Sequence, residues 1–247
     1  HGILLVTGPT GSGKSTTLYA SLNRIVSEAV KAITVEDPVE YHVEGVNQIQ
    51  VNAKTGMTFS SGLRAILRHD PDIIMIGEIR DHETAEAAVQ ASLTGHLVFS
   101  SLHTNDAASA TTRLLDMGIE PYLVSSSVAG ILAQRLVRRI CDACGKERAC
   151  EASEIPEGLW RPESGKVREA PGCRECRHTG YRGRIGVFEL LQLTDAIREL
   201  VMSSADANQI RDAGLASDDL ILLRDAAWRL VCEGKTTPSE AFRVLRC

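Results

Sequence analysis

One glycine-rich octapeptide constrains the fold of this chain more than any other feature. Residues 8–15 read GPTGSGKS, which fits the pattern GxxxxGK[ST] of a phosphate-binding P-loop. The apolar run Ile3–Val6 precedes the octapeptide, and a helix-like run from about Ser15 to Ser27 follows it. Strand, loop and helix in this order are the context in which the motif binds phosphate, so the chain is predicted to bind a nucleoside triphosphate.

The residues of this loop have distinct predicted roles. Glycines permit a positive φ and bring backbone N–H groups close to phosphate oxygens, and the following helix adds the positive end of its dipole. Lys14 can reach the β- and γ-phosphates, and Ser15 can hold the Mg²⁺ that accompanies ATP. The predicted ATP-binding residues are Gly8, Pro9, Thr10, Gly11, Ser12, Gly13, Lys14, Ser15 and Thr16.

Length and charge narrow the function classes. A chain of 247 residues allows one α/β domain with an attachment, or two small domains. The net charge of -5 gives no overall basic field that would attract nucleic acid. No apolar run approaches the roughly 18 residues of a membrane span. The chain begins two residues before a strand that should be central in its sheet, so we expect it to be a fragment of a longer protein, with the N-terminal part removed.

An acidic turn follows the second predicted strand. The β-favouring run Ala32–Val35 leads into the sequence EDPVEY at residues 36–41, where Pro38 sets a turn. In open α/β sheets the carboxyl ends of the strands line the ligand crevice. We therefore predict that Glu40 orients or activates the attacking water, and the alternative is a solvated acidic turn.

A later predicted strand is also followed by a carboxylate. The apolar run Ile73–Ile76 ends in GEIRD at residues 77–81, which is the arrangement of a Walker B strand. Glu78 is predicted to act on Mg²⁺, directly or through water. Arg80 is a candidate for neutralising phosphate charge or for a subunit interface, unless it pairs with Asp81 or Glu83.

Three further candidates are cationic or titratable. A helix is predicted from Phe59 to Leu67, and Arg64 and Arg68, four residues apart, should share a face. They form either a solvated basic face or a phosphate clamp that reaches a neighbouring subunit's nucleotide. His103 follows the predicted strand Leu97–Leu102, where a γ-phosphate sensor would lie; a core or capping histidine is the alternative.

Strand and helix patterns predict an α/β fold for the first part of the chain and helices for its C-terminal part. Strands alternate with helices from His1 to about Leu102, which is typical of a doubly wound parallel sheet. One later helix is expected from Pro121 to about Ile140, ending with Arg138 and Arg139. Helices are also predicted for residues 81–93, 107–117 and 195–246, with a short strand or helix start at 187–191.

Two CxxC pairs predict a metal site. Each pair supplies two thiolates, and two pairs close a tetrahedral Zn²⁺ site without an open position, so the metal should be structural. The redox alternative lacks the βαβ setting that it requires. The predicted ligands are Cys141, Cys144, Cys173 and Cys176, while Cys150, Cys232 and Cys247 are left over.

Taken together, the motifs resemble the secretion ATPases of the type II secretion and type IV pilus assembly superfamily. The resemblance rests on a Walker A loop, an "Asp box", a Walker B strand, a "His box" and the tetracysteine; the first four span Gly8–Ser15, Ile33–Tyr41, Ile73–Asp81 and Thr94–Asp106. The runs Ser125–Cys141 and Gly180–Glu189 add to it, and the former is most similar to the type II (GspE-like) branch. Pilus assembly ATPases are the close alternative, whereas pilus retraction ATPases generally lack the tetracysteine.

The resemblance implies a fold and roles for single residues. It implies a RecA-like P-loop sheet with helices on both faces, at residues 1–140, a zinc subdomain at 141–186 and a C-terminal helical part at 187–247. Glu40 becomes the catalytic glutamate and Glu78 the Walker B glutamate. The resemblance implies that His103 responds to the γ-phosphate. It also implies that Arg64, Arg68 and Arg80 contribute positive charge at a subunit boundary.

The resemblance also implies a cellular setting. It implies a cytoplasmic, hexameric motor that hydrolyses MgATP at the inner membrane and contacts platform proteins through an upstream region, with anionic lipid as a further partner. Two other classes remain open. A nucleic-acid translocase is disfavoured because the chain is acidic and poor in stacking aromatics. A nucleotide-gated module without hydrolysis is disfavoured by the carboxylates Glu40 and Glu78.

Overall fold

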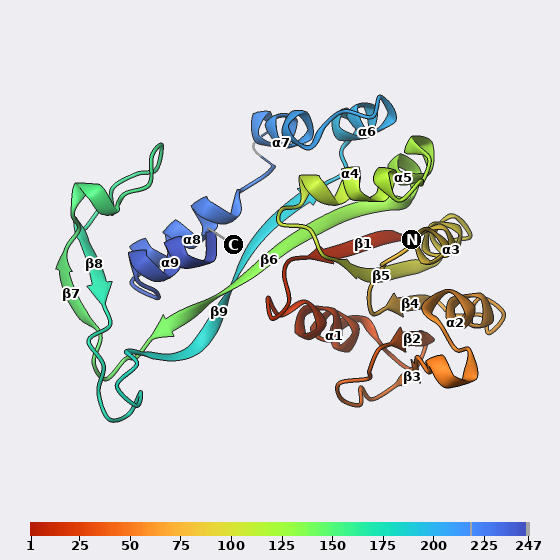
Figure 1. Ribbon diagram of the computed structural model, residues 1–247, viewed down its shortest axis with the longest axis horizontal. Coiled ribbons are helices and arrows are strands. Elements are labelled where there is room, and N and C mark those ends of the chain that lie inside the picture. The colour runs from red at the N-terminus through yellow and green to blue at the C-terminus, as the bar shows by residue number, and fades with distance from the viewer. Residues whose placement is uncertain (218, 246–247) are drawn as a thin grey trace. The chain divides into compact units, whose positions relative to one another are not determined.

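The computed structural model describes residues 1–217 and 219–245 and contains two compact units (Figure 1). The first unit comprises His1–Ala133 and Leu190–Leu220, and the second comprises Gln134–Glu189 and Ile221–Cys247. The three-part division at residues 140 and 186 stays a prediction. The predicted last helix reached Arg246, which lies outside the described residues together with the left-over Cys247.

A mostly parallel sheet forms the centre of the first unit. Its strands are consecutive partners in the order β3-β2-β4-β5-β1, and β1 also pairs in parallel with β6. Parallel neighbours require crossover connections, which the helices provide. Consequently the carboxyl ends of β1, β2, β4 and β5 meet at one edge. The strands are β1 (Gly2–Thr7), β2 (Ala32–Glu36), β3 (Val46–Gln50), β4 (Ile73–Ile76), β5 (Leu97–Leu102), β6 (Val128–Ile140) and β9 (Tyr181–Gln192).

Helices cover both faces of this sheet, as predicted. Side chains alternate between the faces of a strand, so the continuous apolar runs of β2 and β4 are buried on both sides. One face packs against the first helix, whose Leu18, Tyr19 and Leu22 share a core cluster with Val6 and Phe99. The helices of this unit are α1 (Lys14–Ile25), α2 (Phe59–Ile66), α3 (His82–Leu93), α4 (Ala108–Asp116), α5 (Pro121–Ser127), α6 (Asp195–Met202) and α7 (Ala207–Ala216), with a 3₁₀ turn at Ala53–Thr55.

The helix predicted from Pro121 to Ile140 is wrong. Helix α5 ends at Ser127, and strand β6 begins at Val128 and continues to Ile140, so Arg138 and Arg139 lie in a strand. Leucine, alanine, glutamine and arginine favour helices, which made the segment look helical. Pairing with β1 outweighs this propensity, since residues 130–133 of β6 align with residues 4–7 of β1 beside the buried core.

The second unit is built around residues 134–140, an antiparallel hairpin and two C-terminal helices. Trp228 is its largest buried side chain, and its indole N–H donates to the Trp160 carbonyl at 2.8 Å. The buried carboxylate of Glu240 accepts hydrogen bonds from the guanidinium groups of Arg138 and Arg243. The elements are β7 (Lys146–Ala149), a 3₁₀ turn (Ala152–Glu154), β8 (Lys166–Glu169), α8 (Leu223–Cys232) and α9 (Pro238–Leu245).

Within the described ranges, none of the helices has both the length and the apolar character required to traverse a lipid bilayer.

Candidate active site and metal centre

The P-loop connects β1 to α1, and its glycines have a positive φ. Gly11 and Gly13 adopt φ values of 78° and 91°, which an L-residue with a side chain rarely adopts. The ammonium group of Lys14 donates to the carbonyls of Gly8 at 2.8 Å and Pro9 at 3.2 Å. The first turn of α1 contains no acidic side chain that would compete with a bound phosphate.

Two threonines join the P-loop strand to the loop after β5. The Thr7 hydroxyl donates to the Thr104 carbonyl at 2.9 Å and accepts from the Thr104 N–H at 2.9 Å. The two hydroxyl oxygens are 2.5 Å apart. Because Thr104 follows His103 directly, this contact places the His103 loop beside the start of the P-loop.

Three predicted site residues meet at the ends of β4 and β5. The Glu78 carboxylate forms an ion pair with Arg80, and its Oε2 lies 3.1 Å from Nε2 of His103. Burial raises the pKa of Glu78, but hydrogen bonds and charge from Arg80 and His103 outweigh burial and lower it below its usual value of 4.5. Glu78 is therefore ionised, as a Mg²⁺ ligand must be.

The alternative pairing of Arg80 with Asp81 or Glu83 is wrong. Asp81 caps α3 by accepting from the Thr84 N–H at 2.8 Å. Glu83 instead pairs with Arg64 at 2.7 Å, and both side chains are more than half exposed. Arg68 lies just beyond the end of α2, is exposed, and makes no side-chain hydrogen bond or ion pair with any residue that the structure describes.

Glu40 lies on the exposed turn after β2. Its backbone N–H donates to the Tyr19 hydroxyl at 3.2 Å, and that hydroxyl in turn donates to the buried carboxylate of Glu36. No sequence motif predicts a role for Tyr19, Glu36, Thr7 or Thr104 individually. A tyrosine on the apolar face of a helix and polar residues at strand ends are common, so only their contacts reveal them.

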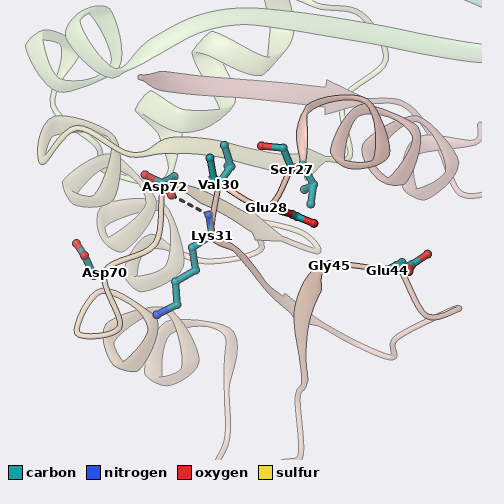
Figure 2. A pocket seen from close by; sticks show the side chains of 10 residues that line it. Ser27, Glu28, Val30, Lys31, Glu44, Gly45, Asp70 and Asp72 are labelled. Atoms are coloured by element: carbon teal, nitrogen blue, oxygen red, sulfur yellow. Dashed lines mark hydrogen bonds between the residues drawn. The ribbon is translucent and has the colours of Figure 1, made fainter.

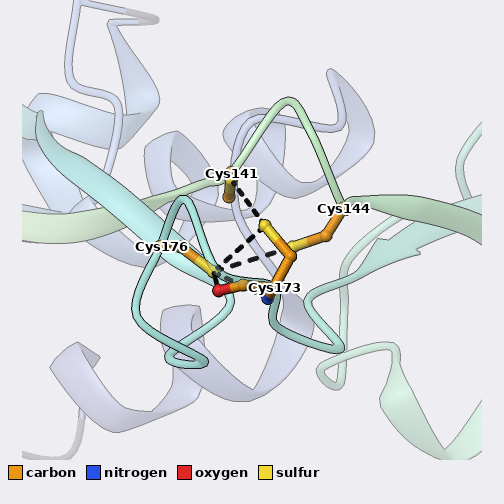
Figure 3. Close-up of side chains that lie close together, drawn as sticks. All are labelled: Cys141, Cys144, Cys173 and Cys176. Atoms are coloured by element: carbon orange, nitrogen blue, oxygen red, sulfur yellow. Dashed lines mark hydrogen bonds between the residues drawn. The ribbon is translucent and has the colours of Figure 1, made fainter.

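The four predicted cysteine ligands gather at one point of the second unit (Figure 3). Their sulfur atoms all lie within 4.8 Å of one another, with 4.0 Å between Cys141 and Cys173 and 3.9 Å between Cys144 and Cys176. A tetrahedral ion with Zn–S bonds of about 2.3 Å would space the sulfurs by about 3.8 Å. The arrangement therefore fits Zn²⁺, with no open position for a substrate.

Backbone groups support negative charge on this cluster. The N–H groups of Cys173 and Gly180 donate to the Cys176 sulfur at 3.1 Å and 3.2 Å. Burial opposes ionisation, but these donors, together with side-chain hydrogen bonds from Cys173 and Cys144, outweigh it and lower the pKa of the Cys176 thiol to about 6. A thiolate is the form that ligates zinc. Cys150 is buried but does not belong to the described cluster.

A pocket of about 700 Å³ lies at the opposite edge of the sheet from the P-loop (Figure 2). It is lined by residues that precede β2, β3 and β4, including Lys31, Gly45 and Asp72. The Asp72 carboxylate accepts from the Lys31 N–H at 2.7 Å. None of the predicted site residues lines this pocket, so it is distinct from the candidate nucleotide site.

The chain is similar to known secretion proteins along its whole length. The family model described as "Type II/IV secretion system protein" matches residues 1–243. The type II secretion system protein E of Pseudomonas aeruginosa is 56% identical over 247 residues, and the match covers 100% of this chain and 49% of the relative. The type II secretion system ATPase E of Vibrio cholerae is 52% identical over 249 residues, with the same coverage. The chain thus spans about half the length of these relatives.

A pilus protein and a solved structure widen the comparison. The type IV pilus assembly ATPase TfpB of Acinetobacter baylyi is 46% identical over 255 residues, covering 99% of this chain and 42% of the relative. The solved structure of the pilus retraction motor PilT with bound ADP has a TM-score of 0.70 at 31% identity, covering 98% of this chain and 60% of that one. The mixed α/β fold, the P-loop and the family match over residues 1–243 agree: the chain belongs to the type II/IV secretion system protein family.

Proposed function

We propose that this chain is the C-terminal, ATP-hydrolysing part of a motor that powers pseudopilus assembly and protein export by type II secretion. One observation carries the proposal: the P-loop, Glu40, Glu78 and His103 all follow the carboxyl ends of strands that are neighbours in one parallel sheet. Relatives named type II secretion system protein E, at 50% identity and above, support the choice of system.

The residues at this edge suit hydrolysis by in-line attack of water. Lys14, now on the carbonyls of Gly8 and Pro9, would exchange them for phosphate oxygens. Mg²⁺ bound with ATP would neutralise charge on the β- and γ-phosphoryl oxygens. The Ser15 hydroxyl and the Glu78 carboxylate are the oxygen groups that would hold it, directly or through water. Glu40 would accept a hydrogen bond from the attacking water and orient it.

His103 and three arginines would respond to the γ-phosphate. His103 would exchange its contact with Glu78 for one with the nucleotide. In a homo-oligomer, which we propose to be a hexamer, Arg64, Arg68 and Arg80 would lie near a subunit boundary and neutralise charge that develops on a neighbour's nucleotide. Arg64 and Arg68 are exposed and suited to reach another subunit.

The proposed setting is the cytoplasmic face of the inner membrane. Platform proteins of the secretion system, bound through a region upstream of this chain, would receive the motion, and anionic lipid would assist docking. Zn²⁺ on Cys141, Cys144, Cys173 and Cys176 would be structural, giving the second unit a rigid surface. The proposed parts are an ATPase core at 1–140, a zinc subdomain at 141–186 and a helical part at 187–247.

The test is ATP turnover by the intact gene product, wild type beside Glu40→Gln. Each protein is assayed alone, with anionic lipid vesicles, and separately with single-stranded DNA. We expect lipid to raise wild-type turnover and Glu40→Gln to lower it by about a hundredfold or more, since a general base contributes about that factor. Wild-type protein without turnover in any of the three conditions would contradict the proposal.

Two further experimental results would distinguish the proposed function from two alternatives. The 46% identity to a type IV pilus assembly ATPase favours pilus assembly as the second candidate. Deletion of the gene in its host should abolish protein export; lost surface pili with intact export would select the second candidate. Stimulation by DNA alone would indicate a nucleic-acid translocase, which the proposal does not expect.

A further inference from the structure

A buried carboxylate lies between the P-loop helix and the turn that carries Glu40. Glu36 ends β2 and is only 4% exposed. Its Oε2 accepts from the Tyr19 hydroxyl, and its Oε1 accepts from Thr34 Oγ1 at 2.5 Å and Gln48 Nε2 at 3.0 Å. Three donors from α1, β2 and β3 therefore surround it, as a buried charge requires.

Strand geometry explains why this carboxylate meets α1. Side chains of alternate residues point to the same face, so Ala32, Thr34 and Glu36 share one face of β2. Ala32 belongs to the core cluster that contains Tyr19, which identifies this face as the one that α1 covers. The opposite face packs against α2, because a Cβ added at Gly62 would lie 3.1 Å from the Val35 side chain.

The same network holds the turn at its backbone. Tyr19 Oη accepts from the Glu40 N–H at 3.2 Å. Gln48 donates to the Tyr41 carbonyl at 3.2 Å and accepts from the Val43 N–H at 2.8 Å. The rings of Tyr19 and Tyr41 meet edge to face with centroids 4.4 Å apart. No hydrogen bond or ion pair from any described residue engages the Glu40 carboxylate, so the turn is fixed while its acidic group stays available.

The single phenolic proton of Tyr19 determines the direction of these bonds. The Tyr19 hydroxyl donates to Glu36 Oε2 while Thr34 and Gln48 donate to Oε1, so the phenolic proton points to Glu36. The lone pairs of the phenol then face the Glu40 N–H. Burial and the neighbouring Glu36 raise the pKa of Tyr19 to about 12, which keeps this proton in place throughout the physiological range.

We propose that Tyr19 is the positioning residue of Glu40: its hydroxyl, anchored on buried Glu36, fixes the Glu40 amide relative to the helix that begins in the P-loop. Tyr19 lies on α1 five residues after Lys14 and four after Ser15. Helix α1 therefore carries Lys14 and Ser15, which are predicted to hold the nucleotide. Through Tyr19 it also sets their distance to Glu40, which is predicted to orient water. The inference rests on the proposed function, in which Glu40 orients the attacking water.

Kinetics of the intact gene product test this role. Tyr19→Phe removes the hydroxyl but keeps the ring that packs in the core. We expect kcat to fall by about tenfold to a hundredfold, because a small misplacement of a catalytic group costs about that factor, while KM for ATP stays within about twofold. Tyr122→Phe, at a side chain that is 57% exposed, is the matched control and should retain wild-type kcat.

A double variant separates positioning from general damage to the fold. In a Glu40→Gln background the hydroxyl has no carboxylate left to position, so adding Tyr19→Phe should change the residual turnover by less than about twofold. An equal fold-loss in both backgrounds would overturn the inference, as would a Tyr19→Phe protein with wild-type kcat.

Hydrogen exchange gives a readout that needs no turnover. Tyr19→Phe should raise amide exchange at least about tenfold in peptides that cover residues 37–43, with exchange in residues 2–7 unchanged. Unchanged exchange at 37–43 would refute the inference. If the wild type hydrolyses no ATP, the proposed function fails, yet exchange still decides whether Tyr19 holds the turn.

Discussion

Nε2 of His103 lies 3.1 Å from Oε2 of Glu78, although the two residues are 25 positions apart and follow different strands. The contact exists because β4 and β5 are parallel neighbours whose carboxyl ends coincide. Arg80 occupies the other oxygen of the same carboxylate. The Glu78 carboxylate thus contacts both Arg80 and His103, which the sequence predicted as separate candidates.

This shared carboxylate leads to a prediction about pH. The lowered pKa of Glu78 means that its ionised form, and the turnover that depends on it, persists as pH falls until the pH approaches that pKa. Arg80→Gln removes the positive charge that favours the Glu78 carboxylate, so the pKa of Glu78 should rise and the acidic limb of kcat/KM should move to higher pH. Profiles of both proteins between pH 4.5 and 8 check this. Arg211→Gln, on the surface of α7, should leave the limb where it is.

The Thr7–Thr104 contact predicts a linked loss of stability and activity. Thr7→Val removes the hydroxyl that bonds to the N–H, carbonyl and hydroxyl groups of Thr104, and we expect unfolding in denaturant to become easier by about 1 to 2 kcal/mol. Turnover should fall as well, because His103 loses its neighbouring anchor. Thr55→Val, in an exposed turn with one local hydrogen bond, should cost less than about 0.5 kcal/mol. Equal effects of the two variants would argue against an anchoring role.

The tetracysteine predicts a bound metal. The purified protein should contain about one zinc per chain by elemental analysis, and Cys141→Ser with Cys144→Ser should reduce this to near zero. Nucleotide binding should persist, since the P-loop belongs to the other compact unit. Cys232→Ser is the control and should keep its zinc. A zinc content that is unaffected by the double variant would exclude these residues as ligands.

Buried Glu240 predicts an acid-sensitive second unit. Although burial raises the pKa of Glu240, hydrogen bonds from Arg243 and Arg138 outweigh it and lower the pKa from 4.5 to about 2. A depressed pKa stabilises the fold fully above the unfolded value, and this contribution is lost as pH falls from about 4.5 toward 2. Glu240→Gln should lower the unfolding free energy at pH 7 by about 2 kcal/mol and flatten its decline below pH 4.5. Chemical denaturation at several pH values measures both effects.

Several elements and contacts could be predicted from local patterns alone. The P-loop spacing predicts strand, loop and helix; a β-favouring run at 32–35 and an apolar run at 73–76 predict strands; and two CxxC pairs predict four converging thiols. In each case residues close together in sequence carry the whole signal, through backbone conformation, side-chain periodicity or ligand spacing. The structure has each of these features where the pattern predicts it.

Other features depend on contacts between distant segments. Residues 128–140 have helix-favouring composition, yet pairing with β1 makes them a strand. Arg80 has acidic neighbours on either side, yet it pairs with Glu78 because Asp81 caps α3 and Glu83 pairs with the distant Arg64. Tyr19 and Glu36 look like ordinary core and strand-end residues until α1 and β2 bring them together. Local sequence specifies which chemical groups follow each strand. Which of these groups meet depends on strand order and helix packing, because these set distances that local patterns do not contain.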